Sequence, residues 1–202
     1  MRYRALAAAL LLPLLAGCRA PEQRIAQSNV AAELHYSPAE NLERMDVALL
    51  QTAHRSIDFA AYSLTDLVVA NALMDAARGV HVRVYRDQTQ FRGEAARATK
   101  ASRSKRKRVD NDEDEDGVAD NDLIARLSAA PNVEIRVKHS HTLMHLKSYC
   151  VDGAFVRSGS ANFSPTGEKR QDNDLVILCD ADSVRTSRQT STQSGIAQTM
   201  SL

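Results

Sequence analysis

Apolar and polar positions repeat with short periods along most of the chain, and the period changes between that of a helix and that of a strand. After Ser37-Pro38, four apolar residues recur at helical spacing, namely Leu42, Met45, Leu49 and Leu50. This spacing predicts an amphipathic helix. A second helical pattern covers residues 67–77 and stops at Gly79, and a short helix is expected over residues 123–127.

Strand-like runs follow the helical ones and become dense in the second half. The predicted strands cover residues 57–62, 80–85, 133–137, 146–151, 154–157 and 175–179. Helices and strands alternate at first, and several strands then follow one another closely. The predicted class is therefore α/β, with a mixed β-sheet flanked by helices.

The N-terminus has the pattern of a targeting segment. Arg2 and Arg4 precede the apolar run 5–15, which is too short to cross a membrane. The run ends in Leu15-Ala16-Gly17-Cys18 and resembles the signal box of bacterial lipoproteins. That resemblance implies removal of residues 1–17, a lipid on Cys18 and a tether over 18–33. A plain signal peptide with a chance Cys is the alternative.

The residue after the lipidation box bears on localisation. Arg19 follows Cys18. By the same resemblance, this favours the outer over the inner membrane. The predicted location is the bacterial cell envelope, with the protein anchored at the periplasmic face of the outer membrane.

Composition narrows the class further. The chain has 202 residues, 26 Lys and Arg against 25 Asp and Glu, and three Cys. This balance argues against a protein that coats nucleic acid with a generally basic surface, although a local basic patch is compatible with it. Three Cys are too few for a disulfide-stapled fold. The length suits one domain, expected over residues 34–182. Cys150 and Cys179 lie in apolar runs, as buried thiols or as a bridged pair.

A charged insertion at residues 103–122 interrupts the pattern. Its acidic part matches DxDxDGxxD through Asp112, Asp114, Asp116 and Asp120, and resembles calcium loops of the thrombospondin type 3 kind. Leu123 stands where an EF-hand needs Glu. The alternatives are a structural Ca2+ site or a solvated loop balancing the basic run 105–108. That basic run could contact nucleic-acid phosphates or lipid headgroups, or remain solvated.

Residues 183–202 form the C-terminal tail, which contains nine Ser and Thr and no aromatic residue. It shows no convincing amphipathic period. We expect this tail to be disordered.

Six residues within one short window carry the candidate chemistry, namely His145, Lys147, Asp152, Gly159, Ser160 and Asn162. On a strand, His145 and Lys147 face the same side. An imidazole beside a fixed cation suits a phosphate group. Gly159 and Ser160 could let the backbone approach an oxyanion, and Asn162 could add an amide donor.

These residues fit HxKxxxxD followed by GSxN, and the run resembles the HKD motif of the phospholipase D superfamily. The resemblance covers approximately residues 34–182, including IDFAAYSLTD and RGVHVRVYRD. Small single-motif bacterial endonucleases of that superfamily look most similar. The resemblance implies a phospholipase D-like fold and phosphodiester hydrolysis through a phosphohistidine, with no metal required for catalysis.

The resemblance also implies a role for each site residue. His145 would attack phosphorus, and Asp172 would orient a histidine, although its spacing is shifted by about one residue. Lys147, Ser160 and Asn162 would bind the substrate phosphate, whereas Asp152 and Gly159 would support the motif. Because the family mechanism needs two histidines and the chain has one motif, we expect a homodimer that shares one active site.

The substrate stays open at this point. A non-specific endonuclease is the first hypothesis, a phospholipase D acting on membrane phospholipids is the second, and a catalytically inactive, membrane-tethered binding module is the third. A zinc cluster of His139, His141 and His145 is disfavoured, because no acidic ligand pattern accompanies it.

Overall fold

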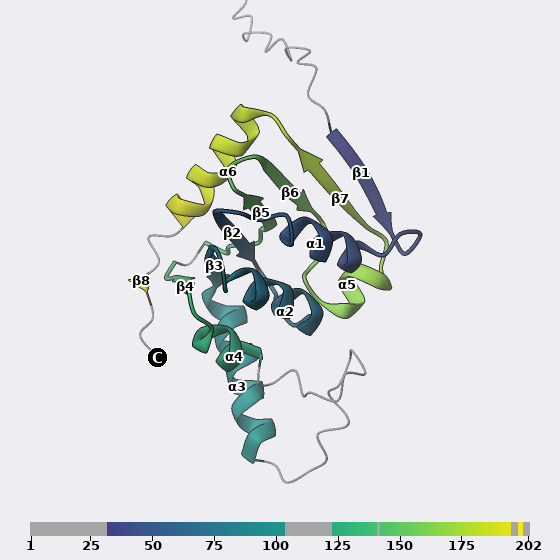
Figure 1. Ribbon diagram of the computed structural model, residues 1–202. Helices are drawn as coiled ribbons and strands as arrows, with labels where there is room; N and C mark the ends of the chain where they lie inside the picture. Colours follow the sequence, from purple (N-terminus) through teal and green to yellow (C-terminus); the bar gives the residue numbers. More distant parts are fainter. Residues whose placement is uncertain (1–31, 104–122, 141, 195–197, 200–202) are drawn as a thin grey trace, which may run out of the picture.

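The computed structural model describes residues 32–103, 123–140, 142–194 and 198–199, whose arrangement is shown in Figure 1. These residues form an eight-stranded sheet in the order β1-β7-β6-β5-β2-β3-β4-β8. The strands are β1 (Ala32–Ser37), β2 (Ser56–Ala61), β3 (His81–Asp87), β4 (Val133–Lys138), β5 (Lys147–Val151), β6 (Phe155–Gly159), β7 (Asn173–Leu178) and β8 (Gln198–Thr199). The helices are α1 (Leu42–Leu50), α2 (Leu67–Ala76), α3 (Gln88–Arg103), α4 (Leu123–Ala129), α5 (Pro165–Lys169) and α6 (Ala181–Ser194). The α/β class with a mixed sheet flanked by helices is confirmed.

Several predicted features lie outside the described residues. They are the signal peptide 1–17, the lipidated Cys18, most of the tether, the basic run 105–108, His141 and the acidic residues Asp112, Asp114, Asp116 and Asp120. Among the described helices, none is long and apolar enough to cross a membrane.

Two kinds of strand pairing meet in the middle of the sheet. β2, β3 and β4 are parallel, as expected when helices connect them. β5 pairs antiparallel to β2, and β6, β7 and β1 continue the sheet antiparallel. The register sets Ala61, the last residue of β2, opposite Lys147, the first residue of β5. The start of β5 therefore lies at the carboxyl edge of the parallel strands.

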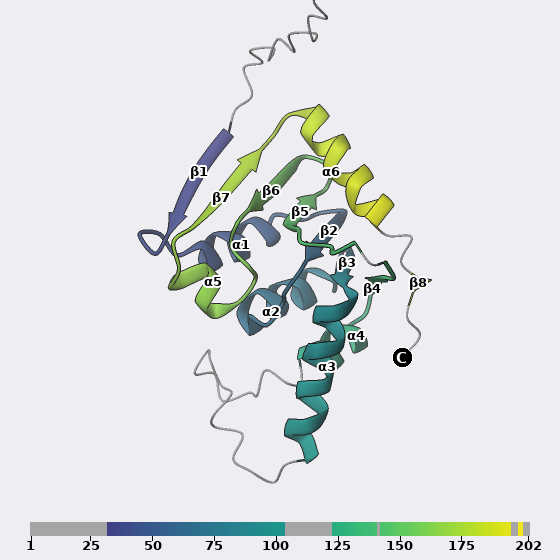
Figure 2. The same ribbon diagram turned by 180° about the vertical axis from the view of Figure 1, so that it is seen from behind.

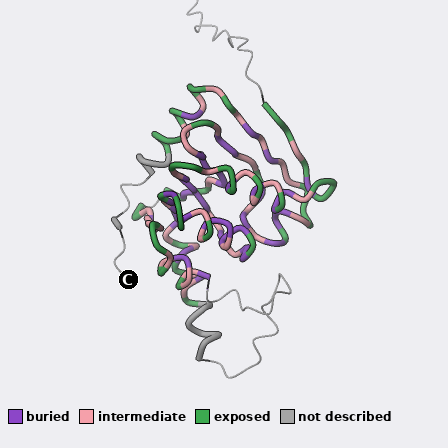
Figure 3. Tube along the Cα trace, in the orientation of Figure 1, coloured by how far each residue is buried: buried purple, intermediate pink, exposed green. Residues whose placement is uncertain are grey.

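Helices cover both faces of the sheet. α1 and α2 lie over one face (Figure 1), whereas α3 and α6 lie over the other, as the view from behind shows (Figure 2). The main core is under α1 and α2, where alternate residues Ile57, Phe59 and Ala61 of β2 meet Leu67 and Leu73 of α2. The buried segments in Figure 3 follow this central layer.

The predicted elements form within a few residues of their expected bounds, and local capping explains where two of the helices begin. The side chain of Asn41 accepts a hydrogen bond from the Arg44 N–H at the start of α1. Asp66 accepts from the N–H groups of Val68 and Val69 at the start of α2. The periodicity did not predict β1, α3, α5 or the two-residue strand β8.

An ion pair between α1 and β6 is buried under the sheet. Asp46 and Arg157 are both fully buried, and Asp46 also accepts a hydrogen bond of 2.7 Å from the Tyr149 hydroxyl. Arg157 Nη1 donates to the carbonyl of Lys147 over 3.0 Å. Glu168 is buried nearby, and burial, reinforced by the Asp46 charge, raises the pKa of Glu168 to about 10. Glu168 is therefore neutral at pH 7.

Replacement of Glu168 by Gln is expected to change the pH dependence of stability. The pKa of Glu168 is raised from 4.5 in the folded protein, so the folded state binds one more proton than the unfolded state between these values. The free energy of unfolding therefore falls as pH rises, by up to about 1.4 kcal/mol per pH unit. Glu168→Gln should remove this contribution. Urea denaturation of both proteins from about pH 5 to about pH 9 measures it, and a stability difference that does not change with pH would contradict the assignment.

The C-terminal tail differs from the expectation. Disorder from residue 183 onward is wrong for the first part of the tail, because α6 runs to Ser194. Asp180 caps this helix by accepting a hydrogen bond from the Ser183 N–H, and Val184 packs against Cys150 and Val156. One capping group and one apolar anchor thus hold a helix whose sequence lacks an apolar stripe.

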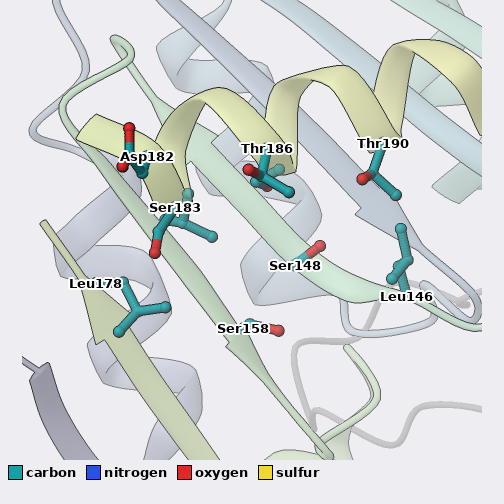
Figure 4. Close-up of a pocket in the computed structure, with 10 residues that line it drawn as sticks. Leu146, Ser148, Ser158, Leu178, Asp182, Ser183, Thr186 and Thr190 are labelled. Atoms are coloured by element: carbon teal, nitrogen blue, oxygen red, sulfur yellow. The ribbon is translucent and has the colours of Figure 1, made fainter. Parts of the chain in front are cut away.

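Because α6 carries hydroxyl side chains where large apolar ones could pack, a groove remains between α6 and the sheet. Its volume is about 450 Å3, and Figure 4 shows hydroxyl side chains of α6 directed toward β5, β6 and β7. The hydroxyl groups that line it belong to Ser148, Ser158, Ser183, Thr186, Ser187 and Thr190. Leu146, Val156 and Leu178 supply its apolar wall. A helix with leucines at these positions would fill the space.

Cys150 and Cys179 are free thiols, the first buried and the second exposed. The structure thus shows no bridge between these two residues, and the expectation of a buried thiol holds for Cys150 alone.

Filling the groove should stabilise the protein. Ser187→Leu places an apolar side chain against the wall of the groove and should raise the free energy of unfolding by about 1 kcal/mol. Gln189→Leu is the matched control, since Gln189 is exposed on α6 and does not line the groove. Thermal denaturation compares the two variants. Equal melting temperatures would show that α6 does not pack as described.

Candidate active site

The HKD residues lie at the carboxyl edge of the parallel strands. His145 is exposed just before β5, whereas Lys147 is 6% exposed at the start of that strand. The loop after β2 runs beside them, and the Tyr62 N–H donates to the carbonyl of Leu146 over 2.8 Å. Ligands of α/β proteins bind at the carboxyl ends of such strands, so this edge is where a substrate is expected.

His145 and Lys147 are in direct contact, as their shared strand face predicts. Lys147 Nζ lies 3.0 Å from His145 Nδ1 and 3.1 Å from Nε2, and donates to the His145 carbonyl oxygen over 3.0 Å. The Tyr62 ring lies against the imidazole, with 4.3 Å between ring centroids. Burial lowers the pKa of Lys147. An imidazole and an ammonium group therefore lie together beside open solvent.

A second segment of the β2–α2 loop holds the GSxN half of the motif. The N–H groups of Thr65 and Asp66 donate to the carbonyl of Phe163, over 2.9 and 3.1 Å respectively. Phe163 directly follows Asn162, whose Oδ1 is buried without a hydrogen-bond partner among the described residues. One loop thus ties both halves of the motif, because Tyr62 bonds Leu146 and Thr65 bonds Phe163.

Gly159 and Ser160 both contact the start of β7, although Ser160 is exposed. A Cβ at Gly159 would lie 2.2 Å from the Asp174 carbonyl oxygen, so glycine is needed for the close approach of β6 and β7. The Ser160 hydroxyl donates to Asn173 Oδ1 and accepts from the Asp174 N–H, both over 3.0 Å. Gly159 thus has a packing role, consistent with its expected support of the motif, whereas the approach of an oxyanion to this backbone stays a prediction.

Asp152 lies at the opposite end of β5 from His145. Its carboxylate accepts hydrogen bonds of 2.7 to 2.8 Å from the N–H groups of His54, Arg55 and Ser56. Burial acts to raise the pKa of Asp152, but these three donors outweigh it and hold the pKa below its ordinary value. Asp152 thereby ties the β5–β6 turn to the start of β2.

Asp172 is exposed in the turn before β7. Among the described residues, no hydrogen bond or ion pair links its carboxylate to a histidine. Its neighbour Asn173 makes the contacts instead, accepting from Ser160 and donating to the Gly167 carbonyl over 2.8 Å. The role of Asp172 in orienting a histidine therefore stays a prediction.

Charged residues behind the site keep this edge in place. Arg86 is buried, pairs with Glu94 and donates to the carbonyl of Ala61 over 3.1 Å. Asp87 accepts from the Met144 N–H over 3.0 Å and caps α3 through its other carboxylate oxygen. Sequence reasoning missed these residues, because nothing local distinguishes them from other charges at strand ends.

The remaining histidines do not assemble a metal site in the part of the chain that is described. No group of three His, Cys, Asp or Glu lies close enough there to hold a metal ion. His139 contacts the Gln88 side-chain amide through Nδ1, 2.9 Å away. His141 lies outside the described residues.

A mixed α/β sheet with a His–Lys pair and a GSxN loop at its edge defines a phospholipase D-like domain. The family model described as "Cardiolipin synthase, PLD-like domain" matches residues 47–192. The chain therefore belongs to the phospholipase D superfamily, whose members are typically phosphodiesterases.

Known relatives agree on this fold. The crystal structure of Nuc from Salmonella typhimurium, a phospholipase D family member, is 18% identical with a TM-score of 0.64, and the match covers 86% of this chain and 99% of Nuc. NucT from Helicobacter pylori is also 18% identical, with a TM-score of 0.61 over 82% and 95% of the two chains. A phospholipase D from Rickettsia bellii is 22% identical over 73% of this chain, which spans 60% of that relative's length.

The packing role of Gly159 can be tested against another glycine. Gly159→Ala forces a Cβ into the backbone of β7 and should lower the free energy of unfolding by about 2 kcal/mol or more. Gly79→Ala is the matched control, because a Cβ there would meet nothing within 4 Å. That variant should be neutral or stabilised by up to about 1 kcal/mol. Urea denaturation measures both, and equal effects would contradict the close approach of β6 and β7.

Proposed function

We propose that this protein hydrolyses phosphodiester bonds through a phosphohistidine, with nucleic acid as its substrate. The observation that carries the proposal is the contact between exposed His145 and buried Lys147, whose segment is bonded by the same loop that bonds Phe163 after Asn162. A nitrogen of His145 attacks phosphorus as the bond to the leaving oxygen breaks. Lys147 and Asn162 hold the phosphate oxygens during this step.

The second half of the reaction needs another histidine. A second imidazole protonates the leaving oxygen, then accepts a proton from the water that attacks phosphorus and frees His145. Within the described chain, His139 is engaged with Gln88, and His54 lies at the far end of β5 beside Asp152. We propose that the second group is His145 of another copy, so that a two-fold dimer shares one site. Sedimentation equilibrium that shows an active monomer would contradict this.

The rim of the site supports nucleic acid over lipid. The side chains that border it at the ends of β3 and β4 include Gln88, Gln90 and His139, which offer both donors and acceptors to polar substrates. One observation favours a phospholipid instead, because Leu143 is 51% exposed just before His145. The phospholipase therefore remains the second candidate.

Two further parts of the proposal rest on sequence patterns alone. We propose that the protein acts in the cell envelope, tethered through Cys18 at the periplasmic face of the outer membrane. Catalysis needs no metal in this scheme, and a structural Ca2+ at the acidic insertion stays a proposal from the sequence pattern.

A parallel assay tests the function. The protein without residues 1–18 is offered DNA and phosphatidylcholine vesicles in the presence of a chelator. We expect DNA cleavage, and we expect His145→Ala to lower it by about a thousandfold or more. His81→Ala is the matched control, because His81 begins β3 at the end opposite the site, and this variant should retain most of the activity.

The other outcomes of this assay would favour a different function. Lipid cleavage alone would assign the protein to the phospholipases, and activity that depends on added metal would contradict the phosphohistidine scheme. A folded dimer inactive on both substrates would favour the binding module.

A further inference from the structure

Lys147 is a buried cation that has no carboxylate partner in the part of the chain that the structure describes. Among the described residues, its ammonium forms no ion pair with an acidic side chain, in contrast to buried Arg86 and Arg157, which pair with Glu94 and Asp46. The groups around Lys147 Nζ are the imidazole and carbonyl of His145 and the ring of Tyr62. Two aromatic rings and a carbonyl oxygen, rather than a carboxylate, thus surround the charge of Lys147.

Tyr62 supplies the aromatic part of that environment. Lys147 Nζ lies over its ring, 4.9 Å from the centroid, and the same ring lies against His145 at 4.3 Å between centroids. Two hydrogen bonds fix Tyr62 in this place. Its N–H donates to the Leu146 carbonyl over 2.8 Å, and its hydroxyl accepts from Gln90 Nε2 over 2.7 Å. Gln90 belongs to α3, whose first turn Asp87 caps.

The choice of an aromatic ring has a physical consequence. A carboxylate at this position would orient Lys147 but would also neutralise its charge, and a substrate phosphate would have to displace it. The face of an aromatic ring attracts an ammonium without cancelling its net charge. Burial lowers the pKa of Lys147, and the ring opposes this effect because it stabilises the charged form.

We propose that Tyr62 is a positioning residue for Lys147. Its ring, which also packs against His145, holds the Lys147 ammonium in place without neutralising the charge, so that the ammonium can bind a phosphate oxygen. This inference rests on the proposed function, because it assigns the charge to a substrate phosphate. Tyr62 itself acts through Lys147 and His145, and the ring rather than the hydroxyl carries the effect.

Two variants of Tyr62 separate the ring from its hydroxyl. Tyr62→Phe keeps the ring and loses the Gln90 hydrogen bond, whereas Tyr62→Leu loses the ring. Tyr36→Leu is the matched control, since Tyr36 is 55% exposed on the edge strand β1, which β7 and β6 separate from Lys147 and β5. Circular dichroism and thermal denaturation establish that each variant is folded before its site is examined.

The first readout does not depend on turnover. NMR follows the titration of Lys147 and its response to inorganic phosphate in the full-length folded protein. In Tyr62→Leu, the Lys147 titration midpoint should fall by about one pH unit and phosphate should bind about tenfold more weakly. Tyr62→Phe should keep a titration midpoint and a phosphate affinity close to those of the wild type, and Tyr36→Leu should match the wild type in both. A wild-type midpoint and wild-type phosphate affinity in folded Tyr62→Leu would overturn the inference.

The second readout is activity on DNA. Tyr62→Leu should lower kcat/KM by about tenfold or more and move the alkaline limb of the pH profile to lower pH, because Lys147 loses its charge earlier. Tyr62→Phe should stay within about threefold of the wild type. If the wild type cleaves no phosphodiester but the NMR differences are found, the proposed function fails and the role of Tyr62 stands. If Tyr62→Leu cleaves DNA with a wild-type pH profile, the role of Tyr62 fails and the proposed function stands.

Discussion

β5 pairs antiparallel to β2, and the site depends on this pairing more than on any other contact. Because Lys147 lies opposite Ala61 in the register, the start of β5 is brought to the edge where three parallel strands end. A shift of one residue would turn Lys147 toward the opposite face of the sheet, away from His145 and Tyr62. Asp152 secures the register from the far end, through three hydrogen bonds to the backbone that enters β2.

Charges buried under the sheet support the same arrangement from the side of α1. Arg157 pairs with Asp46 and donates to the carbonyl of Lys147, so one guanidinium connects a helix, β6 and the first residue of β5. Removing one partner of such a pair leaves an uncompensated buried charge, which is costly. Glu168 can lie beside this pair because its raised pKa keeps it neutral at pH 7. The protein therefore distinguishes cations that are neutralised for structure from Lys147, which is left available.

The two faces of the sheet differ in how well they are filled. Under α1 and α2 the core is a continuous apolar cluster, whereas α6 contributes mainly hydroxyl side chains over the other face and leaves an open groove. The site lies at the edge of the sheet and is held by the first of these faces through Tyr149, Arg157 and Phe163. The groove nonetheless borders the site, because Leu146 and Ser148, the residues on either side of Lys147, line it.

The sequence by itself determined the class of fold and the main catalytic candidates. Period-two and helical patterns predicted most strands and three helices, because burial of one face imposes those periods. The spacing of His145 and Lys147 predicted their shared face for the same reason. Tertiary structure decided what no local pattern encodes. It brought Tyr62 against Lys147 from the loop after β2, set the backbone of Gly159 close to Asp174, placed Asn173 against Ser160, and held α6 as a helix without an apolar stripe. Each of these depends on contacts between distant segments, whose energies act only once the sheet has formed.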